Sequence, residues 1–256
     1  MPQRTKTMMV YMRADRDANP ATPEGGLAGG SGLYLPFGIT VCGIEELGEH
    51  CAAGISHVLS ILDPDWPVPE AFGSFGEHRK LELRFHDVIE DGIAGMRPPG
   101  ADDVARILAF GRDLVGESDG MGHLLVHCHA GVSRSTASMA LIIAQARPDA
   151  TATAVLSEVL RVRPQAWPNL RILEMGDAQL VRRGTLIDAA GALYRRHLAS
   201  QPELAAGMRA GPDRRDGWTA ARSAWVRDGG THSKSRHPRG GFWQLLAETG
   251  MAVDRK

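Results

Sequence analysis

One short segment in the middle of the chain constrains the fold more than any other. An apolar run from Leu124 to Val126 leads into residues 127–135, and a helical stretch continues from Thr136 to Arg147 until Pro148 ends it. A short apolar run suits a buried strand, and proline ends a helix because it has no backbone N–H and clashes with the preceding turn. The segment is therefore predicted to fold as a buried strand, a tight loop and a helix in immediate succession.

The rest of the central chain alternates between strand and helix patterns. Short apolar runs and period-2 alternation predict strands at 33–37, 39–42, 57–62 and 81–85. Apolar residues at helical spacing predict helices near 44–51, 102–115, 151–160 and 170–183. Strands that alternate with helices predict an α/β domain with a central, mostly parallel sheet flanked by helices.

Composition divides the chain into three parts. Residues 1–32 are rich in Gly, Pro, Asp and Asn without periodicity, which indicates a flexible N-terminal arm. Residues 33–184 form the predicted domain, and residues 185–256 form a C-terminal helical and irregular extension that begins with a helix from about Leu186 to Leu198. The extension also contains Trp218, Trp225, Trp243 and a basic stretch at 232–239, which we interpret as a solvated tail.

Charge and cysteine content limit the classes of partner. The net charge of -1 gives no global field that would attract nucleic acid or an anionic membrane, so neither partner is expected. No apolar run reaches the length of a membrane span, and the stretch from Met8 to Met12 is too short for the core of a signal peptide. Cys42, Cys51 and Cys128 are an odd, sparse set that suits free thiols in a reducing compartment. We therefore expect a cytoplasmic protein.

The loop after Val126 combines a nucleophile with the parts of an anion-binding site. Cys128 and Arg134 are separated by five residues, and Gly131 between them lets successive backbone N–H groups turn inward. Arg134 stands where the helix begins, so the amides, the helix N-terminus and a planar guanidinium can bind one oxyanion together. A cysteine thiol in such a positive field ionises more readily than a free thiol. The spacing thus predicts a thiolate and a phosphate site in one pocket.

The motif His127-Cys128-x5-Arg134-Ser135 resembles the phosphate-binding loop of the cysteine-dependent protein tyrosine phosphatase superfamily. It is most similar to the dual-specificity-like branch and to compact bacterial members. The resemblance extends over about residues 33–183 and includes Pro168-Asn169 ahead of a helix. It implies a phosphate monoester hydrolase that acts on phosphorylated protein, with phosphotyrosine and possible dual-specificity substrates.

The resemblance also implies a role for each residue of the loop. Cys128 is the nucleophile that becomes a cysteinyl phosphate, and Arg134 stabilises the phosphate oxygens. Ser135 donates a hydrogen bond to the cysteine sulfur, and His127 orients the loop and promotes ionisation of the thiol. The implied phosphate-binding residues are His129, Ala130, Gly131, Val132, Ser133 and Arg134.

A carboxylic acid must protonate the leaving group, and the resemblance implies that it lies on a loop after a strand. The predicted strand at 81–85 ends in His86-Asp87, and Asp91 follows four residues later. We favour Asp87, because a strand-end acid is the pattern in the dual-specificity branch, and Asp91 stays the alternative. The Trp-Pro-Asp motif of the large tyrosine phosphatases is missing. Asp65-Trp66-Pro67 has related residues in another order and lies too early, so we interpret it as a turn.

Other chemically capable residues have simpler interpretations. Cys42 and Cys51 lie among apolar residues and are predicted to be core residues. Arg161 and Arg163 are interpreted as solvating a helix end, with attraction of an acidic substrate as the alternative. No Cys/His cluster has zinc spacing, and neither a metal nor another cofactor is expected.

Two other functions stay open. One is hydrolysis of phosphoinositides, inositol phosphates or RNA 5′ ends, although related enzymes with highly charged substrates often carry lysines in the loop and this loop has none. The other is a module that binds phosphate without turnover, although such modules usually lack the cysteine or the arginine. An aromatic wall for a deep phosphotyrosine slot has no clear candidate in the sequence, although Trp66, Phe72 and Phe75 lie in an irregular stretch that could supply one.

Overall fold

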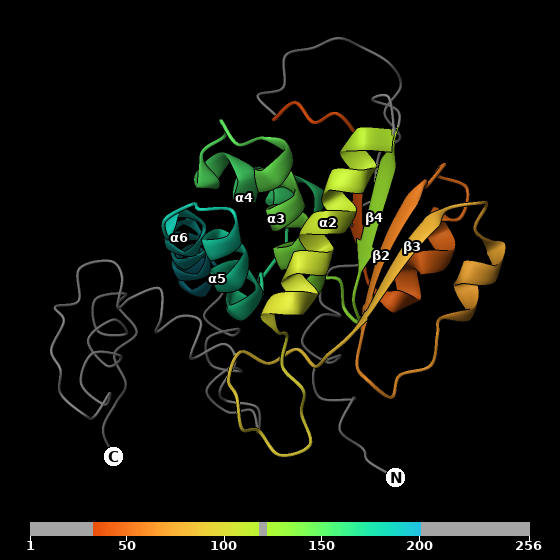
Figure 1. Cartoon of the computed structure of the whole chain (residues 1–256), viewed down its shortest axis with the longest axis horizontal. Helices are drawn as coiled ribbons and strands as arrows, with labels where there is room; N and C mark the ends of the chain where they lie inside the picture. The colour runs from red at the N-terminus through yellow and green to blue at the C-terminus, as the bar shows by residue number, and fades with distance from the viewer. Residues whose placement is uncertain (1–32, 118–121, 201–256) are drawn as a thin grey trace, which may run out of the picture.

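The computed structural model of the chain describes residues 33–117 and 122–200. The predicted arm at 1–32 lies outside the described residues, as do the three tryptophans and the basic tail of the extension. The described part contains a single 4-stranded sheet in the order β1-β4-β2-β3 (Figure 1). All neighbouring strands are parallel, which confirms the predicted α/β fold with a parallel sheet.

The strands and helices follow the predicted alternation. The strands are β1 (Gly38–Cys42), β2 (His57–Leu62), β3 (Arg79–Arg84) and β4 (His123–His127). Two short 3-10 helices follow β1 and β2, namely η1 (Ile44–His50) and η2 (Glu70–Ser74). The α-helices are α2 (Ala101–Glu117), α3 (Arg134–Ala146), α4 (Ala152–Val162), α5 (Leu170–Gln179) and α6 (Thr185–Ser200).

Two predicted elements differ from the structure. Residues 33–37 are not a strand, and Pro36 in this stretch has no N–H to donate to a neighbouring strand. The helix predicted at 170–183 ends earlier, at Gln179. Val181 and Arg183 have positive φ angles of 55° and 57°, which an α-helix cannot contain.

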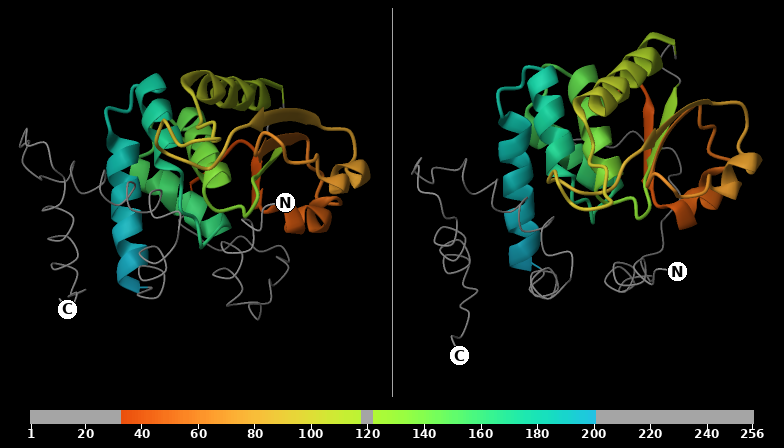
Figure 2. Two further views of the ribbon diagram at one scale, coloured as in Figure 1. Left: turned by 90° about the horizontal axis from the view of Figure 1, so that it is seen from below. Right: turned by 60° about the horizontal axis from the view of Figure 1, so that its bottom comes forward.

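The two faces of the sheet carry different layers. Helices α2 to α6 lie on one side of the sheet, whereas η1 and η2 lie on the other (Figures 1 and 2). Alternate residues of a strand point to opposite faces, so Leu124 and Val126 of β4 join the core under the α-helices and Leu125 joins the small core under η1 and η2. The same parallel sheet therefore buries both of its faces, as such sheets do.

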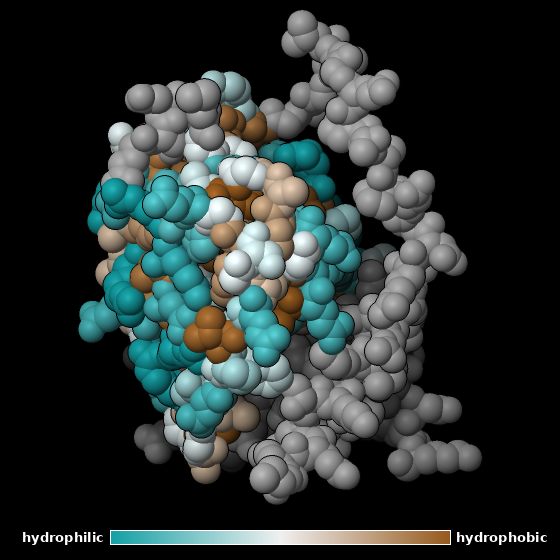
Figure 3. Space-filling view, turned by 90° about the vertical axis from the view of Figure 1, so that its right-hand side faces the viewer, coloured by the Kyte–Doolittle hydropathy of each residue, from teal (hydrophilic) through white to brown (hydrophobic). Residues whose placement is uncertain are grey.

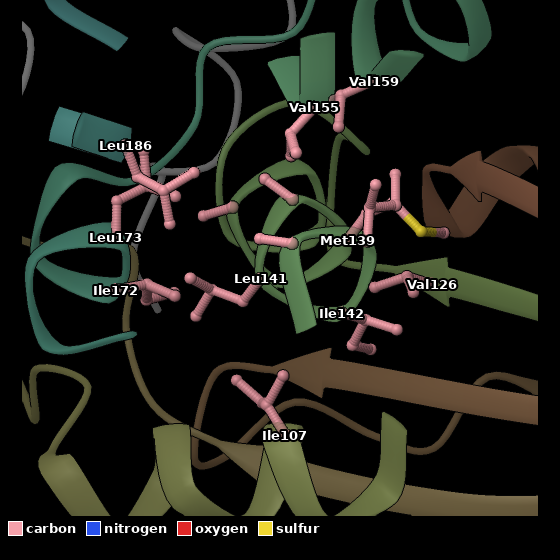
Figure 4. Close-up of a cluster of buried hydrophobic side chains, with 14 of the residues drawn as sticks. Ile107, Val126, Met139, Leu141, Ile142, Val155, Val159, Ile172, Leu173 and Leu186 are labelled. Carbon is pink, nitrogen blue, oxygen red and sulfur yellow. The ribbon is translucent and has the colours of Figure 1, made fainter. Parts of the chain in front are cut away.

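Helix α3 passes through the centre of the larger core. Its residues Ala137 to Ala144 are all buried, and Figure 4 shows Met139, Leu141 and Ile142 among side chains from β4, α2, α4, α5 and α6. A helix that is buried on all sides lies at the centre of the core. Because α3 begins at Arg134, this packing fixes the end of the candidate loop.

Helix α6, the first part of the predicted extension, packs against the same core. Its residues Leu186, Ala190 and Tyr194 are buried. The Tyr194 ring stacks on Trp167 with 4.7 Å between the ring centroids, and its hydroxyl donates to the carbonyl of Pro168. The segment between α4 and α5 is thus supported from α6.

The outer face near β3 and η2 carries no single large apolar patch. Figure 3 shows this side of the molecule with scattered hydrophobic residues between hydrophilic ones. Among the described residues, every helix falls short of the length and apolar character that a membrane span requires.

Candidate active site

The candidate residues meet at one edge of the sheet. Cys128 directly follows β4, which lies between β1 and β2 in the sheet. Asp63 directly follows β2, and Asp87 lies three residues after β3. Parallel strands have their carboxyl ends at a common edge, where open α/β sheets bind ligands. Residues distant in the chain therefore surround Cys128.

Gly131 allows the loop to pass close to the end of β1. Its φ is +70°, in the left-handed region that favours glycine. A Cβ at this position would lie 2.4 Å from the carbonyl carbon of Cys42 and 2.6 Å from the backbone nitrogen of Gly43. The amide of Ile44 adds a hydrogen bond of 3.0 Å to the carbonyl of His129. Both conformation and space therefore require glycine at 131.

The loop carbonyl groups from His129 to Ser133 all bond to the surrounding protein. The carbonyls of His129 and Val132 accept from the amides of Ile44 and Trp167, at 3.0 Å and 2.9 Å. Those of Ala130 and Gly131 accept from one arginine, and that of Ser133 accepts from an amide ahead of α5. In a planar trans peptide the N–H points opposite to the C=O. The amides that follow these carbonyls therefore point into the loop, an arrangement that suits an anion and that we call the cradle.

The arginine that holds the outer side of the loop is Arg163. Its Nη2 and Nε donate to the carbonyls of Ala130 and Gly131 at 2.9 Å and 3.0 Å. Its Nη1 donates to Glu46 Oε1 at 3.0 Å. The interpretation of Arg163 as a solvated helix end is therefore wrong, since its side chain is only 13% exposed. Arg161, by contrast, is 61% exposed and pairs with Glu158 on the same helix.

Cys128 lies at the base of the cradle. It is buried, and its Sγ is 3.2 Å from Ser135 Oγ. His127, which precedes it, is fully buried, and its Nε2 is 2.8 Å from Ser60 Oγ on β2. Burial lowers the pKa of His127 to about 4, so its ring is neutral at neutral pH. A neutral His127 therefore has no positive charge that would favour the Cys128 thiolate, and its ring is held by Ser60.

Arg134 is buried, with its guanidinium between two carboxylates. Its Nη1 donates to Asp63 Oδ1 at 2.7 Å and to the carbonyl of Phe85 at 2.6 Å. Its Nε is 3.9 Å from Asp87 Oδ2. Burial disfavours the charged guanidinium, but the charges of Asp87, Cys128 and Asp63 outweigh burial and raise the pKa of Arg134. The site therefore keeps a permanent cation beside the thiol.

The two candidate acids have different surroundings. Asp87 lies against the loop, where its Oδ1 accepts from Ser133 Oγ at 2.7 Å and from Asn169 Nδ2 at 2.9 Å. Asp91 is 75% exposed and forms a two-point ion pair with Arg171, at 2.9 Å and 3.0 Å. The structure thus brings Asp87, and not Asp91, to the cradle.

Sequence reasoning left Asn169 and Asp63 without a role. Asn169 is buried, and its Oδ1 accepts from the amide of Ile172 as the N-cap of α5 while its Nδ2 holds Asp87. Only the Pro168-Asn169 similarity pointed to it. Asp63 follows a strand directly, so the strand-end argument applied to Asp87 would also have found Asp63.

His129 and Trp66 form part of the rim. The Trp66 ring lies 4.3 Å from the His129 ring, centroid to centroid, at an interplanar angle of 55°. His129 Nε2 accepts from the backbone amide of Asp63 at 3.2 Å. Burial and then the charge of Arg134 lower the pKa of His129 to about 4, so this ring is also neutral. The stretch read as a turn therefore contributes an aromatic surface beside the cradle.

The described residues contain no cluster of three or more His, Cys, Asp or Glu side chains that could hold a metal ion.

Comparisons with known proteins give structural likenesses. No protein-family model and no curated protein sequence matches the chain. The crystal structure of human DUSP28 is 15% identical, covers 56% of this chain and 94% of its own, and gives a TM-score of 0.42. The crystal structure of DUSP15 is 23% identical, covers 58% of this chain and 90% of its own, and gives a TM-score of 0.42. The crystal structure of the Cydia pomonella PTP-2 phosphatase is 20% identical, covers 55% of this chain and 84% of its own, and gives a TM-score of 0.43.

Proposed function

We propose that this chain is a cysteine-dependent phosphatase that hydrolyses phosphate monoesters, with tyrosine-phosphorylated protein as its substrate. One observation carries the proposal. Every loop carbonyl from His129 to Ser133 is bonded outward, so the loop amides face the interior above Cys128, with the Arg134 guanidinium at the same place. Such an arrangement binds a tetrahedral dianion and places phosphorus next to sulfur.

The first step forms a bond between sulfur and phosphorus. The Cys128 thiolate attacks phosphorus, and the bond from phosphorus to the leaving oxygen breaks. Asp87, 2.7 Å from Ser133 Oγ at the loop, gives its proton to that oxygen. Arg134 and the loop amides stabilise the charge on the remaining oxygens.

The second step returns the enzyme to its starting state. The Asp87 carboxylate takes a proton from water, and the water oxygen bonds to phosphorus while the bond between sulfur and phosphorus breaks. Cys128 leaves as a thiolate, and the Ser135 hydroxyl, 3.2 Å from Sγ, donates a hydrogen bond to it. Inorganic phosphate is the product.

The rim favours a single phosphate on an aromatic group. His129 is neutral, Trp66 is aromatic, and Asp63 adds a carboxyl group beside Arg134. A substrate with several phosphates, such as an inositol phosphate, needs additional cations. An aryl phosphate instead gains from contact with an aromatic surface. We therefore favour phosphotyrosine over phosphoinositides, with phosphoserine and phosphothreonine as secondary substrates.

Free thiols support a reducing compartment. Cys42, Cys51 and Cys128 are all unpaired in the structure, and a thiolate nucleophile must stay reduced. We propose that the protein acts in the cytoplasm.

The function is tested with the full chain in a metal-free buffer that contains a reductant. Phosphate release is measured from p-nitrophenyl phosphate, a phosphotyrosine peptide and a phosphatidylinositol phosphate. Cys128→Ser is compared with Cys51→Ser, which removes a thiol between η1 and β2. We expect turnover of the first two substrates that Cys128→Ser abolishes and Cys51→Ser retains.

Other outcomes identify the alternatives. Preference for the lipid would replace phosphotyrosine as the substrate class. Tight binding of the phosphopeptide without phosphate release by folded, reduced protein would show a binding module and refute the enzymatic proposal.

A further inference from the structure

We propose that Asp63 is a positioning residue that fixes the Arg134 guanidinium so that its free edge faces the phosphate. The proposal rests on the proposed function, because it assigns a purpose to the phosphate-binding arginine. The side chain of Asp63 acts through Arg134 and does not itself contact the substrate.

The hydrogen bonds of Arg134 are unevenly distributed over its nitrogens. Nη1 donates to both Asp63 Oδ1 and the Phe85 carbonyl, at 2.7 Å and 2.6 Å. Nε, which is buried, makes no hydrogen bond within the described part of the chain, although Asp87 Oδ2 lies 3.9 Å from it. A buried donor without a partner is costly unless a ligand satisfies it.

Guanidinium geometry determines which edge is available. In arginine, the Nε–H and one N–H of Nη2 point to the same edge of the planar group, away from Nη1. A planar fork of this kind binds two oxygens of one phosphate. Because Asp63 and the Phe85 carbonyl both accept from Nη1, they leave the Nε and Nη2 edge for the ligand. The two hydrogen bonds also fix the plane of the guanidinium. Loss of Asp63 would leave one backbone carbonyl to hold the plane.

The backbone at Asp63 is itself held in place by Arg84. Arg84 Nη1 donates to the carbonyls of Asp63 and Pro64, at 3.3 Å and 3.4 Å, and to that of Trp66. Arg84 is fixed in turn by Glu82, because Arg84 Nε donates to Glu82 Oε1 at 2.8 Å. The turn after β2 is therefore anchored to β3, and the carboxylate of Asp63 has a defined position beside Arg134.

A competing interpretation makes the opposite prediction. If Asp63 occupied the phosphate position, its removal would strengthen binding of free phosphate. Its carboxylate, however, shares Nη1 with a backbone carbonyl and makes no hydrogen bond to Nε. The geometry therefore predicts that removal of Asp63 weakens phosphate binding.

The test measures the dissociation constant of inorganic phosphate by calorimetry with the full chain, which requires no turnover. Asp63→Ala is compared with Asp65→Ala, an exposed acid of the same turn. Loss of a hydrogen bond to a charged group predicts about 10- to 100-fold weaker binding for Asp63→Ala. Asp63→Asn keeps an acceptor for Nη1 and is expected to lose less. Asp65→Ala is expected to match the wild type.

A double-mutant cycle separates positioning from general damage to the fold. In an Arg134→Ala background, Asp63→Ala is expected to weaken phosphate binding no further. If Asp63→Ala fails to fold, Asp63→Asn in both backgrounds decides the question. The proposal would be overturned if the Asp63 variant bound phosphate more tightly than the wild type or as tightly as Asp65→Ala. It would also be overturned if the Asp63 substitution weakened phosphate binding equally with and without Arg134. A wild type that binds phosphate but hydrolyses no monoester would refute the proposed function and leave this test intact.

Discussion

Folding of this protein should depend on pH in part through the fully buried histidine His127. Its ring is fully buried between β4 and β2, with Nε2 on Ser60 Oγ and the Phe72 ring 5.4 Å away. Burial lowers its pKa from 6.5 to about 4 in the folded protein. The unfolded chain thus binds a proton on this residue more readily than the folded one. The stability that this difference contributes is present above pH 6.5 and is lost as the pH falls toward 4.

The size of the effect follows from the shift. One pKa unit corresponds to about 1.4 kcal/mol, so this shift corresponds to about 3 kcal/mol once both states are protonated. At pH 5 the unfolded state is almost fully protonated and the folded state is still mostly neutral. We therefore expect the free energy of unfolding to fall by about 2 kcal/mol between pH 7.5 and pH 5 through His127 alone.

The assay is urea unfolding followed by circular dichroism at these two pH values. His127→Gln removes the titration and keeps an amide that can reach Ser60, and His78→Gln, in the loop before β3, controls for the loss of one imidazole. Burial also lowers the pKa of other histidines, such as His123, but these remain in both proteins and cancel in the comparison. The wild type should lose about 2 kcal/mol more than His127→Gln. Equal losses would refute the assignment of His127 as a neutral ring under the loop.

Three further predictions concern the loop and the acid. Asp87→Asn should lower kcat on a phosphotyrosine peptide by about 100-fold or more, whereas Asp91→Asn should stay near the wild type; steady-state kinetics that reverse this order would make Asp91 the acid. Gly131→Ala should abolish phosphate binding in calorimetry and lower the free energy of unfolding by about 2 kcal/mol or more, because its φ is +70° and its Cβ would contact backbone. Arg163→Met should lower kcat/KM by about 10-fold or more, because the carbonyls of Ala130 and Gly131 lose their hydrogen bonds to Arg163. Equal activity in Arg163→Met and the exposed control Arg161→Met would contradict the role given to the loop carbonyls.

The sheet and the loop were predictable because their signals are local. A strand, the Cys128-x5-Arg134 spacing and a helix are contiguous, and the chemistry of the cradle follows from backbone geometry. Short apolar stretches likewise gave β1, β2 and β4, alternation gave β3, and helical spacing gave most of the helices. The wrong prediction of a strand at 33–37 has the same origin. The apolar residues around Pro36 give a local strand pattern, but Pro36 has no N–H to donate to a neighbouring strand.

The supporting contacts were not predictable because they join distant parts of the chain. Asp63 and Arg134 are 71 residues apart, and Arg163 reaches the Gly131 carbonyl across 32 residues. A single arginine at a helix end has the same sequence pattern whether it is solvated or bonded to a loop. Tertiary packing decides between the two, and here the start of η1 provides Glu46 as the partner that draws Arg163 inward.

The position of Asp87, the proposed acid, depends on a helix that composition assigned to the extension. Asp87 is held by Asn169, and the segment before Asn169 rests on α6 through the Tyr194 hydroxyl and the stack on Trp167. Burial raises the pKa of Tyr194, so its hydroxyl stays protonated and remains a donor to the Pro168 carbonyl. The Trp167 amide in turn donates to the Val132 carbonyl in the loop. Asp87, the proposed acid, and the loop are therefore both held by the one segment that contains Trp167, Pro168 and Asn169.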